Sequence, residues 1–144
     1  MMEQKQLTLK EASMRLWKKK FCFSGRISRD EFWLGMVSLL ILEMILSHLT
    51  YLCVGTVSVL FYPAYLATIS KGLLILAGIF GILLVLVGIV GIASITRRLH
   101  DIGKSGWWQL ILIIPCIGML IIFFWTLYIS DQDNQYGKAP YMQD

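Results

Sequence analysis

A nearly uncharged stretch from Phe32 to Thr96 limits what this chain can fold into more than any other feature. Within its 65 residues only Glu43 and Lys71 carry side chains that are fully charged in water. One crossing of a bilayer takes about 20 apolar residues, so the stretch is longer than one span and too apolar for a water-soluble core. The whole chain of 144 residues is 57% hydrophobic, with a mean hydropathy of +0.69. We therefore expect an all-α fold, that of a polytopic helical membrane protein.

The apolar segments predict three principal transmembrane helices, at about residues 32–53, 72–95 and 107–129. Each segment has about the length that a bilayer requires. Ser28 precedes the first segment and is followed three residues later by Glu31, which is the arrangement of a helix-capping box.

Two parts of this pattern are less regular. Residues 54–70 are apolar but contain Pro63 and several serine and threonine residues. We expect these residues to do one of three things: extend the first span, form a re-entrant or interfacial segment, or make a fourth helix. The third span contains Pro115 and Gly118, where we expect a kink because proline removes a helical hydrogen bond.

The placement of charge predicts the orientation. Residues 1–31 carry a net charge of +4, and residues 131–144 a net charge of −2. Short loops rich in lysine and arginine stay on the cytoplasmic side, so we expect the amino terminus and the loop at 97–106 in the cytoplasm, with two crossings between them. A third crossing would then place the carboxyl terminus outside. The chain thus divides into a basic cytoplasmic segment, a membrane domain at 32–129 and a polar tail at 130–144.

Residues 7–23 interleave apolar and basic side chains. This pattern is typical of a basic amphipathic helix on a membrane surface, and equally of a solvated charged tail. Lysine and arginine flank the predicted spans, so we expect no nucleic-acid partner. Cys22, Cys53 and Cys116 are scattered without a Cys-x-x-Cys spacing. This predicts free thiols, and we expect no metal and no cofactor.

Five basic residues are the candidates for contact with anionic lipid headgroups or with a partner at the cytoplasmic face. They are Arg26, Arg29, Arg97, Arg98 and Lys104. A cation near an anionic leaflet gains about 1 kcal/mol of attraction. The alternative is a structural role, in which Arg97 and Arg98 pair with Asp30, Glu31 or Asp101.

Aromatic and ionisable residues within the spans indicate their depth. Trp33, Trp107 and Trp108 are expected to be interfacial anchors, because tryptophan favours the headgroup level. Glu43 and His48 are the polar residues expected inside the membrane. A charge at the bilayer centre costs at least about 2.5 kcal/mol, so Glu43 is either a protonated residue that faces other helices or an ion or proton site.

The loop at 97–106 also contains residue types that occur in catalytic sites. His100, Asp101 and Ser105 could form a hydrolytic triad. His100 and Asp101 could also hold a divalent metal together with Asp30 and Glu31. Triad members normally come from separate elements, and no established catalytic motif is present. We therefore expect no catalytic residue. His100 is expected to cap the end of the second span instead, and Ser105 the start of the third.

Three motifs carry a resemblance to a known family: FSGRISRDEFW at residues 23–33, RRLHDIGKSGWW at 97–108 and NQYGKAP at 134–140. From about Leu16 to Pro140 the chain strongly resembles the domain of unknown function 805 family of small bacterial inner-membrane proteins. The resemblance implies a multi-pass protein of the bacterial cytoplasmic membrane. It supplies no catalytic residue.

Together these observations favour a structural or interaction protein that is not an enzyme. The basic loop at 97–106 would contact anionic membrane lipids or a partner at the cytoplasmic face. The partner would be either a second copy of the chain or another membrane protein. The first alternative is a component of a small transporter or channel that uses Glu43. The second is a membrane-surface enzyme acting on lipid headgroups.

Overall fold

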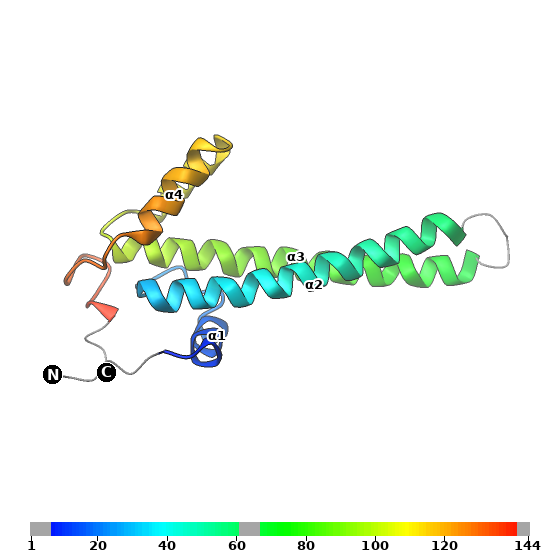
Figure 1. Ribbon diagram of the computed structural model, residues 1–144, viewed down its shortest axis with the longest axis horizontal. Coiled ribbons are helices and arrows are strands. Elements are labelled where there is room, and N and C mark those ends of the chain that lie inside the picture. The colour runs from blue at the N-terminus through cyan, green and yellow to red at the C-terminus, as the bar shows by residue number, and fades with distance from the viewer. Residues whose placement is uncertain (1–6, 61–66, 141–144) are drawn as a thin grey trace. The chain divides into compact units, whose positions relative to one another are not determined.

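The computed structural model describes residues 7–60 and 67–140. Its elements are α1 (Leu9–Lys18), α2 (Arg29–Leu60), α3 (Ala67–Asp101), the 3₁₀ helix η2 (Gly106–Ile113) and α4 (Ile117–Leu127), coloured in chain order in Figure 1. Among the described residues the only β-type pairing is an isolated bridge between Asn134 and Gly137. The expected all-α fold is therefore confirmed.

The chain divides into two compact units. The first comprises Met1–Ser38 and Ile89–Asp144, and the second is Leu39–Gly88. The first unit contains α1, the start of α2, the end of α3, η2, α4 and the tail. The second contains the remainder of α2 and α3. We describe each unit by itself, and the candidate site lies entirely in the first.

Two helices are long and apolar enough to cross a membrane, by their length and composition. These stretches are Arg29–Val57 and Lys71–Asp101, with 29 and 31 residues. They contain the predicted spans at 32–53 and 72–95. The segment at 54–70 is not a separate helix, because α2 continues to Leu60 and α3 begins at Ala67. The rest of that prediction, at residues 61–66, lies outside the described part of the chain.

Helix α1 confirms that part of the basic amino-terminal segment is helical. It begins with a capping box that the sequence reading missed: Thr8 Oγ1 accepts from the Glu11 amide, and the Glu11 carboxylate accepts from the Thr8 amide at 3.1 Å. The buried face of α1 includes Leu16, which packs against Gly35 of α2. A Cβ at Gly35 would lie 2.5 Å from Leu16 Cδ1, so any larger residue there would require the Leu16 side chain to move. The position of α1 on a membrane surface stays a prediction.

The predicted third transmembrane helix at 107–129 is not confirmed. Two short helices, η2 and α4, replace one long helix, and the chain breaks between them at Pro115 and Cys116. Pro115 has no amide hydrogen to donate, and Cys116 has a φ of 64°, in the left-handed region. Where a kink was expected, the chain therefore reverses its direction. Each arm is only about 16 Å long, roughly half the thickness of the hydrocarbon layer.

The two arms form an antiparallel hairpin. Trp108, near the start of η2, lies edge-on to Trp125, near the end of α4, with ring centroids 5.4 Å apart. A Cβ at Gly118 would overlap the carbonyl oxygen of Ile111, so the two backbones touch near the tip. Most large side chains of the hairpin are exposed, among them Ile113 and Ile117. The hairpin is therefore apolar on its outer surface as well as at the seam between its arms.

Helix α3 ends in a hydrogen-bonded turn that needs a glycine. The Lys104 amide donates to the Leu99 carbonyl at 2.8 Å, and the Gly103 amide to the His100 carbonyl at 3.1 Å. Gly103 has a φ of 72°, as expected for the residue after a helix end in this motif. The turn directs the chain into η2, where Ser105 Oγ accepts from the Trp107 amide. The expected capping role of Ser105 is confirmed.

Candidate functional site

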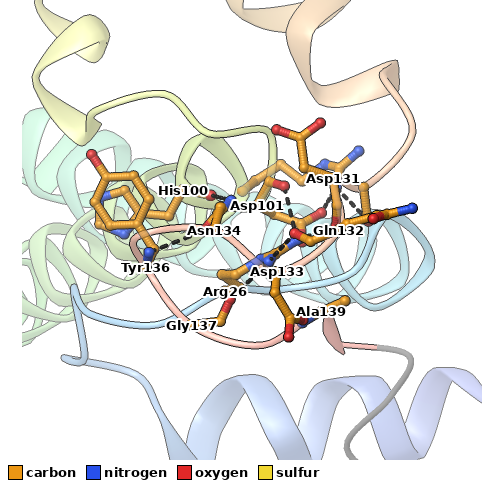
Figure 2. A network of polar contacts seen from close by, with 12 residues as sticks. Arg26, His100, Asp101, Asp131, Gln132, Asp133, Asn134, Tyr136, Gly137 and Ala139 are labelled. Atoms are coloured by element: carbon orange, nitrogen blue, oxygen red, sulfur yellow. Dashed lines mark hydrogen bonds and ion pairs between the residues drawn. The ribbon is translucent and has the colours of Figure 1, made fainter.

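Asp101 is the centre of a buried polar cluster at the end of α3 (Figure 2). Its carboxylate binds two guanidinium groups: Oδ1 accepts from Arg26 Nε at 3.0 Å, and Oδ2 accepts from Arg98 Nη1. The side chains of Asp101 and Arg98 are fully buried, and that of Arg26 is 1% exposed. Two cations thus share one carboxylate, so backbone carbonyl groups must supply the remaining acceptors.

Arg98 obtains its other acceptors from the end of α4. Its Nε donates to the Thr126 carbonyl at 3.2 Å, and its Nη2 donates to the Tyr128 carbonyl. The last carbonyls of a helix lack partners within the helix, and a cation there also interacts favourably with the helix dipole. Arg98 therefore holds the returning arm of the hairpin against α3.

Arg26 obtains its acceptors from the polar tail. Nη1 donates to the carbonyls of Gln132 at 2.7 Å and Gly137 at 2.9 Å, and Nη2 donates to that of Asp131. The Asp131 amide in turn donates to the Asp101 carbonyl at 3.1 Å. The tail is thus fastened to the amino-terminal segment and to the end of α3.

The tail folds as a turn that contacts His100. Asn134 Nδ2 donates to the His100 carbonyl at 2.9 Å, and the Tyr136 ring is stacked on the His100 ring at 3.9 Å, with an interplanar angle of 3°. His100 Nδ1 lies 3.2 Å from the Gly25 carbonyl. His100 was expected to cap its own helix. In the structure its imidazole joins the tail to the amino-terminal segment, and Asn134 binds its carbonyl group.

The three motifs of the sequence meet in this one cluster, which we call the arginine–aspartate cluster. FSGRISRDEFW supplies Gly25 and Arg26, RRLHDIGKSGWW supplies Arg98, His100 and Asp101, and NQYGKAP supplies Asn134, Tyr136 and Gly137. The motifs are far apart in the chain, since Arg26 and Gly137 are separated by 111 positions. Nothing in the spacing of the motifs alone predicts that they converge.

The cluster corrects the prediction that five basic residues face lipid. Counting backbone and side chain together, Arg26, Arg97 and Arg98 are only 9%, 1% and 0% exposed. The structural alternative holds for Arg98, which pairs with Asp101. Lipid contact stays a prediction only for Arg29, which is exposed, and for Lys104, whose Nζ lies 4.4 Å from the centre of the Trp125 ring.

Arg97 differs from its neighbour because no carboxylate forms an ion pair with it among residues 7–60 and 67–140, and Glu31 acts on it only by longer-range electrostatic attraction. Its Nε donates to the Ala93 carbonyl at 3.4 Å, and its Nη2 donates to Ser94 Oγ at 3.3 Å. The predicted pairing of Arg97 with Asp30, Glu31 or Asp101 is absent from the ion pairs of the described residues. The side chain instead folds back along its own helix.

The three predicted anchor tryptophans lie in different surroundings. Trp107 and Trp108 are 79% and 51% exposed, which agrees with an interfacial position. Trp33 instead packs edge-on against Phe123 of α4, with centroids 5.7 Å apart. Its indole N–H is buried and has no hydrogen-bond acceptor in the described part of the chain. Trp33 therefore contributes to packing between α2 and α4.

His100, Asp101 and Ser105 do not form a hydrogen-bonded triad. Asp101 is occupied by two arginines, His100 Nδ1 faces the Gly25 carbonyl, and Ser105 Oγ caps η2. Among the described residues no group of three or more histidine, cysteine, aspartate or glutamate side chains is placed to hold a metal ion. The hydrogen-bond donors of Arg26 and Arg98 in the cluster are directed at acceptors of the protein itself.

The ionisable residues Glu43 and His48 belong to the second unit. Both are exposed on α2. A shallow hollow of about 500 Å³ beside them is lined by Met44, Ser47, His48 and Tyr51. The Glu43 side chain lies at the surface of this unit, so its contact with other helices and its role as an ion or proton site both stay predictions.

Cys22 is the one cysteine with a distinct chemical environment. Its Sγ lies 3.3 Å from Ser24 Oγ. The hydrogen bond with the Ser24 hydroxyl lowers the pKa of the Cys22 thiol from its ordinary value, because it stabilises the thiolate. All three cysteines are free thiols, as predicted.

Comparison with known proteins agrees with this architecture. The chain is 29% identical over 131 residues to the inner membrane protein YhaH of Escherichia coli K12, covering 90% of this chain and 96% of YhaH. It is 43% identical over 51 residues to the inner membrane protein YhaI of the same organism, covering 34% of this chain and 42% of YhaI. No solved structure matches the chain. The profile of the family described as "Protein of unknown function (DUF805)" matches residues 20–138, so the chain belongs to the DUF805 family.

Proposed function

We propose that this chain is a non-catalytic structural protein of the bacterial inner membrane that presents a rigid, folded surface at the cytoplasmic face. The arginine–aspartate cluster is the observation that carries the proposal, since it fixes the amino-terminal segment, the end of α3, the hairpin and the tail to one another. A buried network in which backbone carbonyls complete the coordination of two arginines defines one arrangement of these segments. Such a surface suits a docking or scaffolding role.

The proposal includes a topology with two crossings. Helices α2 and α3 would cross, and the hairpin of η2 and α4 would enter the cytoplasmic leaflet and return. This assignment is supported by the hydrogen bond from the Asp131 amide to the Asp101 carbonyl, because it brings the tail to the arginine-rich end of α3. The basic segments favour the cytoplasm for that end. The carboxyl terminus would then be cytoplasmic, contrary to the expectation from three crossings.

Cysteine accessibility tests this topology. Single-cysteine proteins would carry either native Cys22, Gln135→Cys or Lys71→Cys, and a membrane-impermeant maleimide would be applied to inside-out and right-side-out vesicles. We expect Cys22 and Gln135→Cys to react in inside-out vesicles, and Lys71→Cys in right-side-out vesicles. Reaction of Gln135→Cys from the same side as Lys71→Cys would establish a third crossing and overturn the topology.

The same surface would contact anionic lipid through Arg29 and Lys104, the two of the five candidate cations that are not buried. Replacing Arg29 and Lys104 together by glutamine should weaken retention of phosphatidylglycerol, by about 2 kcal/mol if each cation contributes about 1 kcal/mol. Lys71→Gln is the matched control, since it removes an exposed cation from the opposite end of α3. Equal retention of lipid by the double variant and the control would remove lipid contact from the proposal.

A component of a small transporter or channel is the second candidate. The observation that favours it is the exposed position of Glu43 and His48 on an apolar helix, since ionisable groups in a membrane generally belong to a wet or protein-covered path. Proton or solute flux into vesicles containing the protein, lost in Glu43→Gln, would support this candidate. Equal flux with and without the protein would exclude it.

A membrane-surface enzyme is the third candidate and has the weakest support. His100, Asp101 and Ser105 make separate contacts, which does not favour shared catalysis. Incubation of the protein with phospholipid vesicles, followed by analysis of the lipids, would test this candidate. Turnover of a headgroup that Ser105→Ala abolishes would overturn the non-catalytic proposal.

A further inference from the structure

A pocket of about 600 Å³ lies beside the arginine–aspartate cluster within the first unit. Ligand sites in proteins commonly have about 300 to 1,000 Å³. One wall is a single face of α3, where Ile92, Thr96 and His100 follow one another at intervals of four residues. The opposite wall is η2, through Gln109 and Leu110. Phe23, Tyr136 and the residues Ser105, Gly106 and Trp107 complete the lining.

The two walls of the pocket, α3 and η2, are fixed in position by direct contacts between them. Gln109 Nε2 donates to Thr96 Oγ1 at 2.6 Å, and a Cβ at Gly106 would lie 2.5 Å from Thr96 Cγ2. At the polar end, the stack of His100 on Tyr136 fixes the tail as part of the rim. The site is therefore largely formed before a ligand binds, which lowers the entropic cost of binding.

The lining changes from apolar to polar along the axis of α3. Ile92 and Leu110 lie on the apolar part of the wall, whereas His100, Ser105 and Tyr136 belong to the end beside the cluster. Within residues 7–60 and 67–140, no hydrogen bond uses the Tyr136 hydroxyl, and the Ser105 hydroxyl acts only as an acceptor. Two hydroxyl donors are thus available to a ligand that has oxygen acceptors next to a hydrocarbon chain.

The rim of the pocket indicates where the ligand comes from. Trp107 and Leu110 are 79% and 57% exposed, and they belong to the hairpin that is apolar on its outer surface. In the topology proposed above, such side chains face the hydrocarbon and headgroup region of one leaflet. A ligand would therefore enter from the membrane.

We propose that this pocket binds one glycerophospholipid of the cytoplasmic leaflet. Its ester and phosphate oxygens accept hydrogen bonds from Tyr136 and Ser105, and one acyl chain lies along Ile92 and Leu110. This inference rests on the proposed membrane topology and adds a defined ligand site to it. The bound lipid would connect the folded surface to the leaflet in which the hairpin lies.

A photoactivatable lipid tests the site in the full-length protein. The probe is phosphatidylglycerol with a diazirine in one acyl chain, in vesicles of phosphatidylethanolamine and phosphatidylglycerol. We expect adducts concentrated near Ile92 and in η2. Leu110→Trp should block the pocket and lower the adduct yield about fivefold or more, whereas Leu112→Trp is the matched control, since Leu112 is 41% exposed on the same helix but does not line the pocket.

A second variant tests the polar end of the site. Tyr136→Phe retains the ring that stacks on His100 and removes only the hydroxyl, so the fold is preserved. Loss of one hydrogen bond should weaken lipid capture about fivefold. Equal adduct yields in wild type, Leu110→Trp and Tyr136→Phe, with adducts spread evenly over the apolar helices, would overturn the proposal, because bulk lipid alone gives that result.

The lipid site and the topology fail in different experiments. If Cys22 and Gln135→Cys react from the same side but the adducts are evenly spread, the lipid site alone is refuted. If those two cysteines react from opposite sides, the topology is refuted, and the lipid site that depends on it falls as well.

Discussion

Asp101→Asn should destabilise the protein by about 3 to 5 kcal/mol, which is the usual cost of removing one partner from a buried ion pair. Asp101 is fully buried and is the one carboxylate shared by Arg26 and Arg98 in the described structure. An asparagine has a single acceptor oxygen, and its NH₂ group would face one of the two guanidinium groups. One charge-assisted hydrogen bond is lost, at about 1.5 to 3 kcal/mol, and both buried guanidinium groups lose the counter-charge that Asp101 supplies.

Thermal unfolding of the purified protein in detergent measures this effect. A loss of about 3 kcal/mol corresponds to a fall in Tm of roughly 10 °C for a chain of this size. Asp30→Asn is the matched control, because the Asp30 side chain is 77% exposed and lies 3.6 Å from Arg29. Exposed pairs contribute at most about 1 kcal/mol. Equal Tm values for the two variants would refute the view that the cluster holds the unit together.

Three further changes test other parts of the structure. Gly118→Ala should destabilise the hairpin by about 3 kcal/mol, because the new methyl group overlaps the Ile111 carbonyl. In the same detergent assay, Gly88→Ala should cause no loss of stability, because its methyl group meets no atom within 4 Å. Cys22 should form its thiolate at a lower pH than an ordinary thiol does, so the increase of its alkylation rate with pH should begin at a lower pH. Ser24→Ala should move this increase to higher pH, because it removes the hydroxyl that stabilises the thiolate. An unchanged pH profile in the variant would contradict this. Deletion of residues 131–144 should remove the tail acceptors of Arg26 and make that arginine accessible to a guanidine-specific reagent, while protection equal to wild type would show that other groups bind it.

The long helices and the cap at the start of α2 could be predicted from the sequence, because they depend on local patterns. The uncharged run at 32–96 determines two helices by hydropathy alone. Ser28 accepts from the Glu31 amide at 3.3 Å, as the capping pattern indicated. In such cases the residues that decide the structure are within a few positions of one another.

The hairpin could not be predicted, because its apolar content is that of a transmembrane helix. Residues 107–129 are long and hydrophobic enough to cross. Pro115 indicated a kink, but the size of the turn depends on the left-handed backbone at Cys116 and on the contact between Gly118 and Ile111. Those contacts exist only after the chain has reversed.

The burial of the arginines was also out of reach of local reasoning. Lys/Arg-rich loops usually face water or headgroups, which made Arg26 and Arg98 plausible surface cations. Besides Asp101, their partners are carbonyl groups of the tail and of α4. Because every residue has a carbonyl group, no side-chain pattern identifies these acceptors.

The attachment of Arg26 to the tail has a consequence for how the protein is made. Arg26 is synthesised well before the carbonyl groups of Gln132 and Gly137, which lie 106 and 111 positions later in the chain. During translation the growing chain therefore carries an arginine whose final acceptors do not yet exist, although its amino-terminal segments can already fold. The arginine–aspartate cluster can be completed only after Gly137 has been synthesised and has left the ribosome, so chains that stop before residue 137 cannot assemble it.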